Sequence, residues 1–196
     1  MLFRSLLQRG VPTRAGLLLT RAEEVGFVGM LAALQSGLLD AEALYINMEC
    51  SSIKAGAIMG NGPVVRVGDR LRIFDPHISA ALVACADVLK GKGKGFAYQR
   101  RLMDSGACEA TPLVQAGLQT GAVALPLGNY HNIGPKQLQA ECIHIEDACA
   151  LVDLLVYLAE TDGGPARALQ EASQALDDDL NRRLQGLRSL LDATAA

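Results

Sequence analysis

The segment LLLTRAEEVGFVG, residues 17–29, is the most informative part of this chain. Its apolar beginning, residues 17–22, predicts a buried strand, which runs into the adjacent carboxylates Glu23 and Glu24 and then a turn rich in glycine. Neighbouring side chains on a strand point to opposite faces, but a twist at the strand end lets both reach one site. Two such acids suit a division of labour, in which one carboxylate binds a metal and the other acts as general base. The alternative is a pair of solvated acids where a strand meets a loop.

Strand-like and helix-like segments alternate along the chain on both sides of this acidic pair. The expected strands are 17–22, 43–50, 64–67, 96–102 and 122–127. The expected helices are 29–36, 77–90, 109–116, 146–160 and 166–191. This alternation predicts an α/β fold with a mostly parallel sheet flanked by helices. We expect residues 1–160 to form the α/β domain and residues 161–196 to form a helical extension, which lies on the domain surface or pairs with a partner helix.

Composition excludes several classes of protein. The 196 residues are 50% hydrophobic and 20% charged, which suits one domain with a sizeable core. A net charge of −3 argues against nucleic-acid binding, which favours a basic face. No apolar run is long enough to predict a transmembrane helix. The five cysteines form no Cys-x-x-Cys pair, which predicts reduced thiols in a cytoplasmic protein.

Polar residues follow three of the expected strands. The first strand ends in Glu23 and Glu24, the second ends at Glu49, and a late strand runs into the segment GNYHN, residues 128–132, which contains His131. Open α/β sheets bind ligands beyond the carboxyl ends of their strands. Carboxylates together with an imidazole suit zinc, cobalt or manganese. The sequence therefore predicts a metal site at this edge of the sheet.

The segment AEEVGFVG, residues 22–29, also resembles the Glu-Glu-Val-Gly-x-x-Gly signature of the co-catalytic zinc aminopeptidases. The resemblance is to the glutamyl aminopeptidase, deblocking aminopeptidase and cellulase M group, which includes the tetrahedral aminopeptidases. An acidic metal ligand follows about 20 to 25 residues later in that family, one βαβ step away, and Glu49 occupies that place. Looser matches lie at residues 60–69, 106–110 and 130–135.

The resemblance implies a zinc-peptidase-like catalytic domain and a role for each residue. Glu23 would be the general base, and Glu24 and His131 would bind one metal ion. Glu49 would bind the second ion, and both would be zinc, cobalt or manganese. A peptide with a free amino terminus is the implied substrate, and a homo-oligomer is the implied assembly.

The chain departs from the family pattern ahead of the acidic pair. The family has a His-x-Asp motif and a bridging aspartate upstream, whereas the 22 residues before Glu23 contain neither histidine nor acid. Asn129 also stands where the family usually has an arginine. We therefore expect the carboxyl-terminal part of a catalytic domain whose amino-terminal part is missing. The alternative is a catalytically silent α/β module that acts in assembly or ligand binding.

The remaining polar candidates are weaker. His77 is expected to be a surface residue at a helix start, and His144 an edge residue rather than a ligand. Cys108 has no histidine near it in sequence that would activate a nucleophilic thiol. Glu109 is interpreted as an acid favoured by the dipole of the following helix, in preference to an acid that supports the site.

Overall fold

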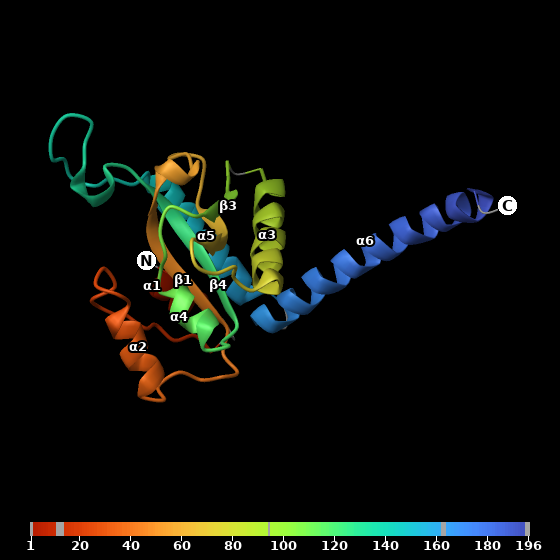
Figure 1. The fold of residues 1–196 in the computed structure, drawn as a ribbon, viewed down its shortest axis with the longest axis horizontal. Coiled ribbons are helices and arrows are strands. Elements are labelled where there is room, and N and C mark those ends of the chain that lie inside the picture. The colour runs from red at the N-terminus through yellow and green to blue at the C-terminus, as the bar shows by residue number, and fades with distance from the viewer. Residues whose placement is uncertain (1, 11–13, 94, 162–163, 195–196) are drawn as a thin grey trace.

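A computed structural model describes residues 2–10, 14–93, 95–161 and 164–194 of the chain. Within these residues a four-stranded sheet has the order β1-β4-β2-β3 (Figure 1). Its strands are β1 (Tyr45–Ser52), β2 (Val64–Asp69), β3 (Gln99–Met103) and β4 (Thr120–Leu127). β1 pairs parallel with β4, β2 pairs parallel with β3, and β2 pairs antiparallel with β4. The prediction of an α/β fold with a mostly parallel sheet is thus confirmed, with one antiparallel pairing at its centre.

Helices flank the sheet and follow the expected order. They are α1 (Leu2–Arg9), α2 (Val28–Gln35), α3 (Pro76–Gly91), α4 (Ala110–Gln115), α5 (Ile145–Glu160) and α6 (Gly164–Thr194). Two short 3-10 turns, η1 (Ile53–Ala55) and η2 (Tyr130–Asn132), follow β1 and β4. The predicted helices are therefore confirmed to within a few residues at each end, and α1 is an additional helix. None of the helices in the described part of the chain combines the length and apolar character needed to span a bilayer.

The start and the buried face of α3 follow directly from its sequence. Asp75 caps the helix, because its carboxylate accepts hydrogen bonds from the backbone N–H groups of His77 at 2.8 Å and Ile78 at 3.1 Å. Pro76 occupies the first turn, where its missing N–H costs nothing. Ile78, Leu82 and Cys85 recur at helical spacing and are all buried.

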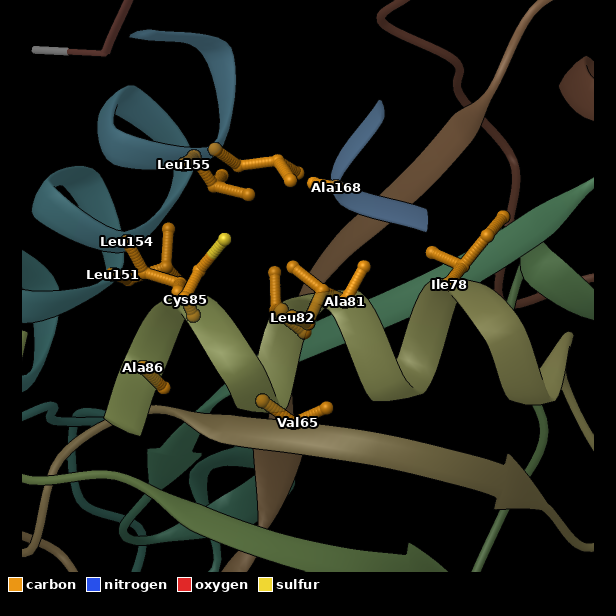
Figure 2. Packing of buried hydrophobic residues seen from close by; sticks show 12 residues of the cluster. Val65, Ile78, Ala81, Leu82, Cys85, Ala86, Leu151, Leu154, Leu155 and Ala168 are labelled. Carbon is orange, nitrogen blue, oxygen red and sulfur yellow. The ribbon is translucent and has the colours of Figure 1, made fainter. Parts of the chain in front are cut away.

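The main core lies between α3, α5 and one face of the sheet (Figure 2). Its central members come from α3, α5, α6 and β2, and include Ile78, Ala81, Leu82, Cys85, Ala86, Leu151, Leu154, Leu155, Ala168 and Val65. Burying each large aliphatic side chain stabilises the fold by about 1.5–3 kcal/mol relative to exposure. This apolar layer fixes the sheet and leaves its other face available for polar side chains.

The two faces of the sheet differ because side chains alternate along each strand. Val65 and Val123 point toward α3 and α5 and join the main core. Val64 and Ala124 belong to a separate small apolar cluster on the opposite face. Arg66 shares that opposite face by its position in β2, and this is the face on which the pocket described below opens.

The predicted strand at residues 17–22 is wrong. These residues adopt no regular secondary structure, and the side chains of Leu17, Leu18 and Leu19 are 50%, 39% and 81% exposed. An extended segment becomes a strand only when a neighbour accepts its backbone hydrogen bonds. None of the strands in the described residues pairs with this segment, so its apolar composition alone does not make it part of the sheet.

The loop before β2 is held by a buried carboxylate of α5. Asp147 is 1% exposed and accepts hydrogen bonds from the backbone N–H groups of Gly60 and Gly62, each at 2.8 Å. Gly62 has a φ of +85°, and a Cβ there would lie 1.8 Å from the carbonyl oxygen of Ala97. Gly62 is therefore required by this close packing, whereas Gly60 is favoured by its left-handed φ of +87°.

Candidate active site

All four residues predicted for the site line one pocket of about 360 Å³. Glu23 and Glu24 come from the turn before α2, Glu49 comes from β1, and His131 comes from η2 just after β4. Because β1 and β4 are parallel neighbours, their carboxyl ends reach the same edge of the sheet. β1 continues past Glu49 to Ser52, so Glu49 lies before the strand end rather than at it, and His131 lies just after β4. Glu23 and Glu24 reach the same pocket from a loop outside the sheet.

The turn that presents Glu23 and Glu24 explains the glycine spacing of the motif. The carbonyl of Glu23 accepts hydrogen bonds from the N–H groups of Gly26 and Phe27, each at 3.0 Å. Gly26 has a φ of +103°, a left-handed conformation that favours glycine. A Cβ on Gly29 would lie 2.5 Å from the carbonyl oxygen of Arg21, so the start of α2 packs directly on the segment before the acids.

Several charges act on Glu23 within the pocket. Burial raises the pKa of its carboxyl above the usual value, and the nearby carboxylates of Glu24, Glu49 and Glu109 raise it further. His131 acts in the opposite direction and lowers this pKa. A carboxylate with a raised pKa accepts a proton more readily, which is the property a general base needs.

The loop that carries His131 is held in an unusual backbone conformation. Asn129, His131 and Asn132 have φ values of 53°, 58° and 60°, in the left-handed region. Asparagine tolerates this conformation, whereas for His131 it costs about 1–3 kcal/mol, so the surrounding structure has to over-determine it. The N–H of His131 donates to a carboxylate oxygen of Glu141 at 2.8 Å, and its ring stacks on Tyr130 with centroids 4.0 Å apart. These contacts orient the imidazole, which lines the pocket.

His131 and Glu24 are close neighbours. The Nε2 atom of His131 lies 3.6 Å from Oε1 of Glu24, and the side chains are 49% and 75% exposed. An exposed contact of this length contributes little stability. The contact matters chemically because it brings an imidazole nitrogen and a carboxylate oxygen into the same small volume.

Glu49, in contrast, already has a cationic partner inside the protein. Arg66 on β2 is 2% exposed, and its Nη1 donates to Oε1 of Glu49 in an ion pair. The Ser51 hydroxyl donates to the same carboxylate. The Arg66 guanidinium also lies 5.6 Å from the ring centroid of Phe74. Burial raises the pKa of the Glu49 carboxyl above its usual value, and Arg66 and Ser51 oppose this rise without cancelling it.

Sequence reasoning missed Arg66, although a signal existed. A lone arginine within the apolar strand VVRV, residues 64–67, has to be either exposed or paired, because an unpaired buried charge is costly. Pairing predicts an acid within reach on the same face of the sheet, and Glu49 supplies it from β1, with β4 between the two strands.

Glu109 supports the acidic turn from the other side of the pocket. It precedes α4 without capping it by a side-chain hydrogen bond. Its carboxylate instead accepts a hydrogen bond from the hydroxyl of Thr20 at 2.5 Å. Thr20 lies three residues before Glu23, so this contact ties the loop to the body of the fold. The interpretation of Glu109 as a helix-dipole acid alone is therefore incomplete.

Most of the chain matches one known protein family. Residues 1–154 match the family described as M42 glutamyl aminopeptidase. The chain belongs to this family. The resemblance found in the Glu-Glu-Val-Gly-x-x-Gly segment is thus confirmed over most of the sequence, and α6 lies beyond the matched residues.

Solved structures of TET aminopeptidases share the fold of this M42 family member. PhTET1-12s, solved as a dodecamer in the asymmetric unit, is 26% identical, with a TM-score of 0.55 over 73% of this chain and 40% of that one. The TET aminopeptidase from Thaumarchaeota archaeon SCGC AB-539-E09 is 17% identical, with a TM-score of 0.59 over 78% and 41% of the two chains. The TET1 peptidase of Pyrococcus horikoshii, which can assemble into a tetrahedron or a large octahedral shell, is 23% identical, with a TM-score of 0.53 over 73% and 40%.

These matches concern a part of each relative. The chain spans about two fifths of the length of the TET proteins it matches, 40% for PhTET1-12s. The two structures below 25% identity show the fold alone. A comparison with curated proteins gives no match.

The donor set of this M42 family member fits a metal ion only in part. No group of three or more histidine, cysteine, aspartate or glutamate side chains forms a metal site among the described residues. Glu24 and His131 offer the right chemistry for one ion, an oxygen and an imidazole nitrogen that converge. Glu49 does not fit a second ion while the guanidinium of Arg66 pairs with it.

Cys108 is expected to be unreactive toward thiol reagents in the folded protein. It is fully buried, and burial raises the pKa of its thiol to about 12, with a further upward contribution from Glu49. The thiolate is the reactive form, and little of it exists near pH 8 at such a pKa. Iodoacetamide at pH 8, followed by peptide mapping, should modify the exposed Cys142 well before Cys108.

The control for this experiment is the same protein unfolded in urea, where both cysteines should react at similar rates. Alkylation of Cys108 in the folded protein at the rate of Cys142 would contradict the burial and the raised pKa of this thiol.

Proposed function

We propose that this chain carries half of a metal-dependent aminopeptidase site, which hydrolyses peptides with Glu23 as general base. The observation that supports the proposal is the convergence of Glu23, Glu24, Glu49 and His131 on one pocket, in a chain that belongs to the M42 family.

Each pocket residue has a distinct proposed role. Glu24 and His131 would hold one ion of zinc, cobalt or manganese, and Glu49 is the candidate ligand for a second ion in a complete site. A bound ion of this kind supplies Lewis-acid polarisation and makes water acidic enough to act as a nucleophile near neutral pH. Glu23 would take the proton from the attacking water and then deliver it to the departing amine. Its position beside Glu24, with its pKa raised by burial, suits a group that has to hold and release that proton.

The charge of the pocket supports a substrate with a free amino terminus. The carboxylates of Glu23, Glu24, Glu49, Glu109 and Glu141 all line it, and Arg66 and His131 are the basic residues in the lining. An α-ammonium group is attracted to such a surface, whereas a blocked amino terminus is not. The proposed substrate class is therefore small unblocked peptides.

The proposed setting is a homo-oligomer in the cytoplasm. All five cysteines are free, which supports a reducing compartment. The TET relatives are solved as large assemblies, and self-association of this chain is proposed by analogy with them.

The second candidate function is a catalytically silent α/β module that acts in assembly or ligand binding. The ion pair of Glu49 with Arg66 favours it, as does the lack of a three-ligand metal group among the described residues. The two functions differ in whether the pocket turns over a substrate.

An activity assay separates the two candidates. Two preparations are tested, the purified chain alone and the chain fused to the upstream catalytic segment of a full-length family member. Each is incubated with an aminoacyl p-nitroanilide and zinc, cobalt or manganese. Release of p-nitroaniline is expected from the substrate with a free amino group, and none is expected from its N-acetylated form or in the presence of a chelator. If neither preparation releases p-nitroaniline, the aminopeptidase proposal fails and the silent module is favoured.

A further inference from the structure

Helix α6 extends well beyond the body of the protein (Figure 1). Its first turns are anchored, because Ala168 is buried in the main core and Leu169 and Ala172 pack against that core. Further along, Leu176, Leu180, Leu184 and Leu187 are 57%, 55%, 49% and 52% exposed. These four residues, which we call the leucine stripe, recur every three or four positions and therefore lie on one side of the helix.

An exposed leucine stripe on a projecting helix requires a partner surface. Helices that are apolar along one side normally bury that side, and most of their stability in proteins comes from this packing. The anchored residues Leu169 and Ala172 belong to the same side of α6, so the stripe continues the surface that the domain already covers at its start. What lies over the stripe has to be an elongated apolar surface, and a second helix is the shape that fits it.

The charges on α6 indicate which helix that is. Residues 177–179, all aspartates, form an acidic turn, and residues 182–183, both arginines, form a basic turn. Leu180 lies between the two turns. An antiparallel partner with the same sequence, centred near Leu180, would place its basic turn beside this acidic turn and its acidic turn beside this basic one. A parallel partner in register would instead place like charges together, which is unfavourable.

The geometry of the flanks agrees with this arrangement. Arg183 and Asp179 lie on one flank of the helix, because Nε of Arg183 is 2.7 Å from a carboxylate oxygen of Asp179 one turn earlier. A two-fold axis between antiparallel helices brings the same flank of each helix against its copy. Asp179 of each chain therefore approaches Arg183 of the other, and the pair exchanges its ionic contacts across the interface.

We propose that α6 is a dimerisation helix that pairs in an antiparallel manner with α6 of a second copy of this chain. The leucine stripes form the apolar seam, and the acidic and basic turns set the orientation. This surface lies outside the residues matched to the M42 family, which end at 154, and it does not depend on the proposed catalytic function.

The first test measures self-association of the full chain by sedimentation equilibrium and multi-angle light scattering. The unmodified protein is expected to dimerise. Leu180→Asp should raise the dissociation constant by roughly a hundredfold, because a carboxylate would have to be buried unpaired at the centre of the seam. The matched control is Leu138→Asp, which makes the same change at a leucine that is 82% exposed on the loop after β4 and should leave the dimer intact.

The second test examines orientation with a charge-inverted chain, in which residues 177–179 become arginine and residues 182–183 become aspartate. Antiparallel pairing predicts that the inverted chain dimerises with itself as well as the unmodified chain does. It also predicts that a mixture of the two contains few mixed dimers by native mass spectrometry, since like charges then meet at both turns. Parallel pairing predicts the reverse, with mixed dimers preferred.

Three results would overturn the proposal. The unmodified chain could remain monomeric at high micromolar concentration, Leu180→Asp could dimerise as well as the unmodified chain, or mixed dimers could dominate the charge-inversion experiment. Circular dichroism of each variant establishes that the helix content is retained, so that a loss of dimer reports on the interface.

Discussion

Replacing Glu23 by glutamine is expected to lower the turnover of a catalytically active preparation by about 10²–10⁴-fold, the usual effect of removing a general base. Glutamine keeps the size and polarity of the side chain but cannot accept the proton. The bound-metal content should stay nearly unchanged, because Glu23 is proposed to move a proton and Glu24 and His131 are proposed to hold the ion. Steady-state kinetics and elemental analysis on the same sample measure both quantities.

Glu24→Gln is the informative comparison, since it changes the adjacent residue by the same chemistry. It should lose metal together with activity, because the amide oxygen is a much weaker ligand for zinc than a carboxylate. Glu42→Gln, at an exposed glutamate outside the pocket, serves as the control and should leave both quantities unchanged. The proposed roles are wrong if Glu23→Gln remains fully active, or if it loses metal to the same degree as Glu24→Gln.

Much of the fold could be predicted because its signals are local. The Asp75-Pro76 pair predicts where α3 starts, and the helical spacing of Ile78, Leu82 and Cys85 predicts which side of it is buried. Such patterns report on capping and periodicity, which depend on residues within a turn or two. The prediction of a strand at residues 17–22 was wrong for the opposite reason, since a strand exists only if another segment pairs with it. No strand pairs with this segment among the described residues, and its leucines are exposed.

The pocket was partly predictable for a similar reason. Parallel strands place their carboxyl ends at one edge of the sheet, and Glu49 in the second half of β1 and the His131 loop after β4 both lie toward that edge. Nothing local showed that Arg66 would reach Glu49, because the two residues lie on strands with β4 between them. Nor did the sequence show that Thr20 would bond to Glu109, a contact between loops far apart in the chain.

Removing either Arg66 or Glu49 alone should destabilise the protein strongly, because the two side chains form a buried ion pair. Breaking such a pair typically costs about 3–5 kcal/mol, because the remaining charge is left uncompensated. Arg66→Met should lie near the lower end of this range, since the Glu49 side chain that remains is 26% exposed and can be partly hydrated. Glu49→Leu should cost more, because it leaves a guanidinium that is 2% exposed.

The double variant decides whether the cost comes from the pair or from its unpaired remainder. Arg66→Met combined with Glu49→Leu removes both charges, and replacing a buried pair by apolar residues is often neutral or stabilising. We therefore expect the double variant to be more stable than either single variant, with a coupling energy of at least about 1 kcal/mol. Urea unfolding followed by circular dichroism gives the free energy of unfolding for all four proteins.

The matched control is the exposed pair of Arg9 with Glu160, whose atoms lie 3.2 Å apart with side chains 54% and 32% exposed. The same substitutions there should change the free energy of unfolding by only about 0–1 kcal/mol, as for other surface pairs. If the double variant at positions 66 and 49 is as unstable as the sum of its single variants, the two side chains are not energetically coupled. Glu49 would then be free to bind an ion in the pocket, and the strongest argument for the silent module would disappear.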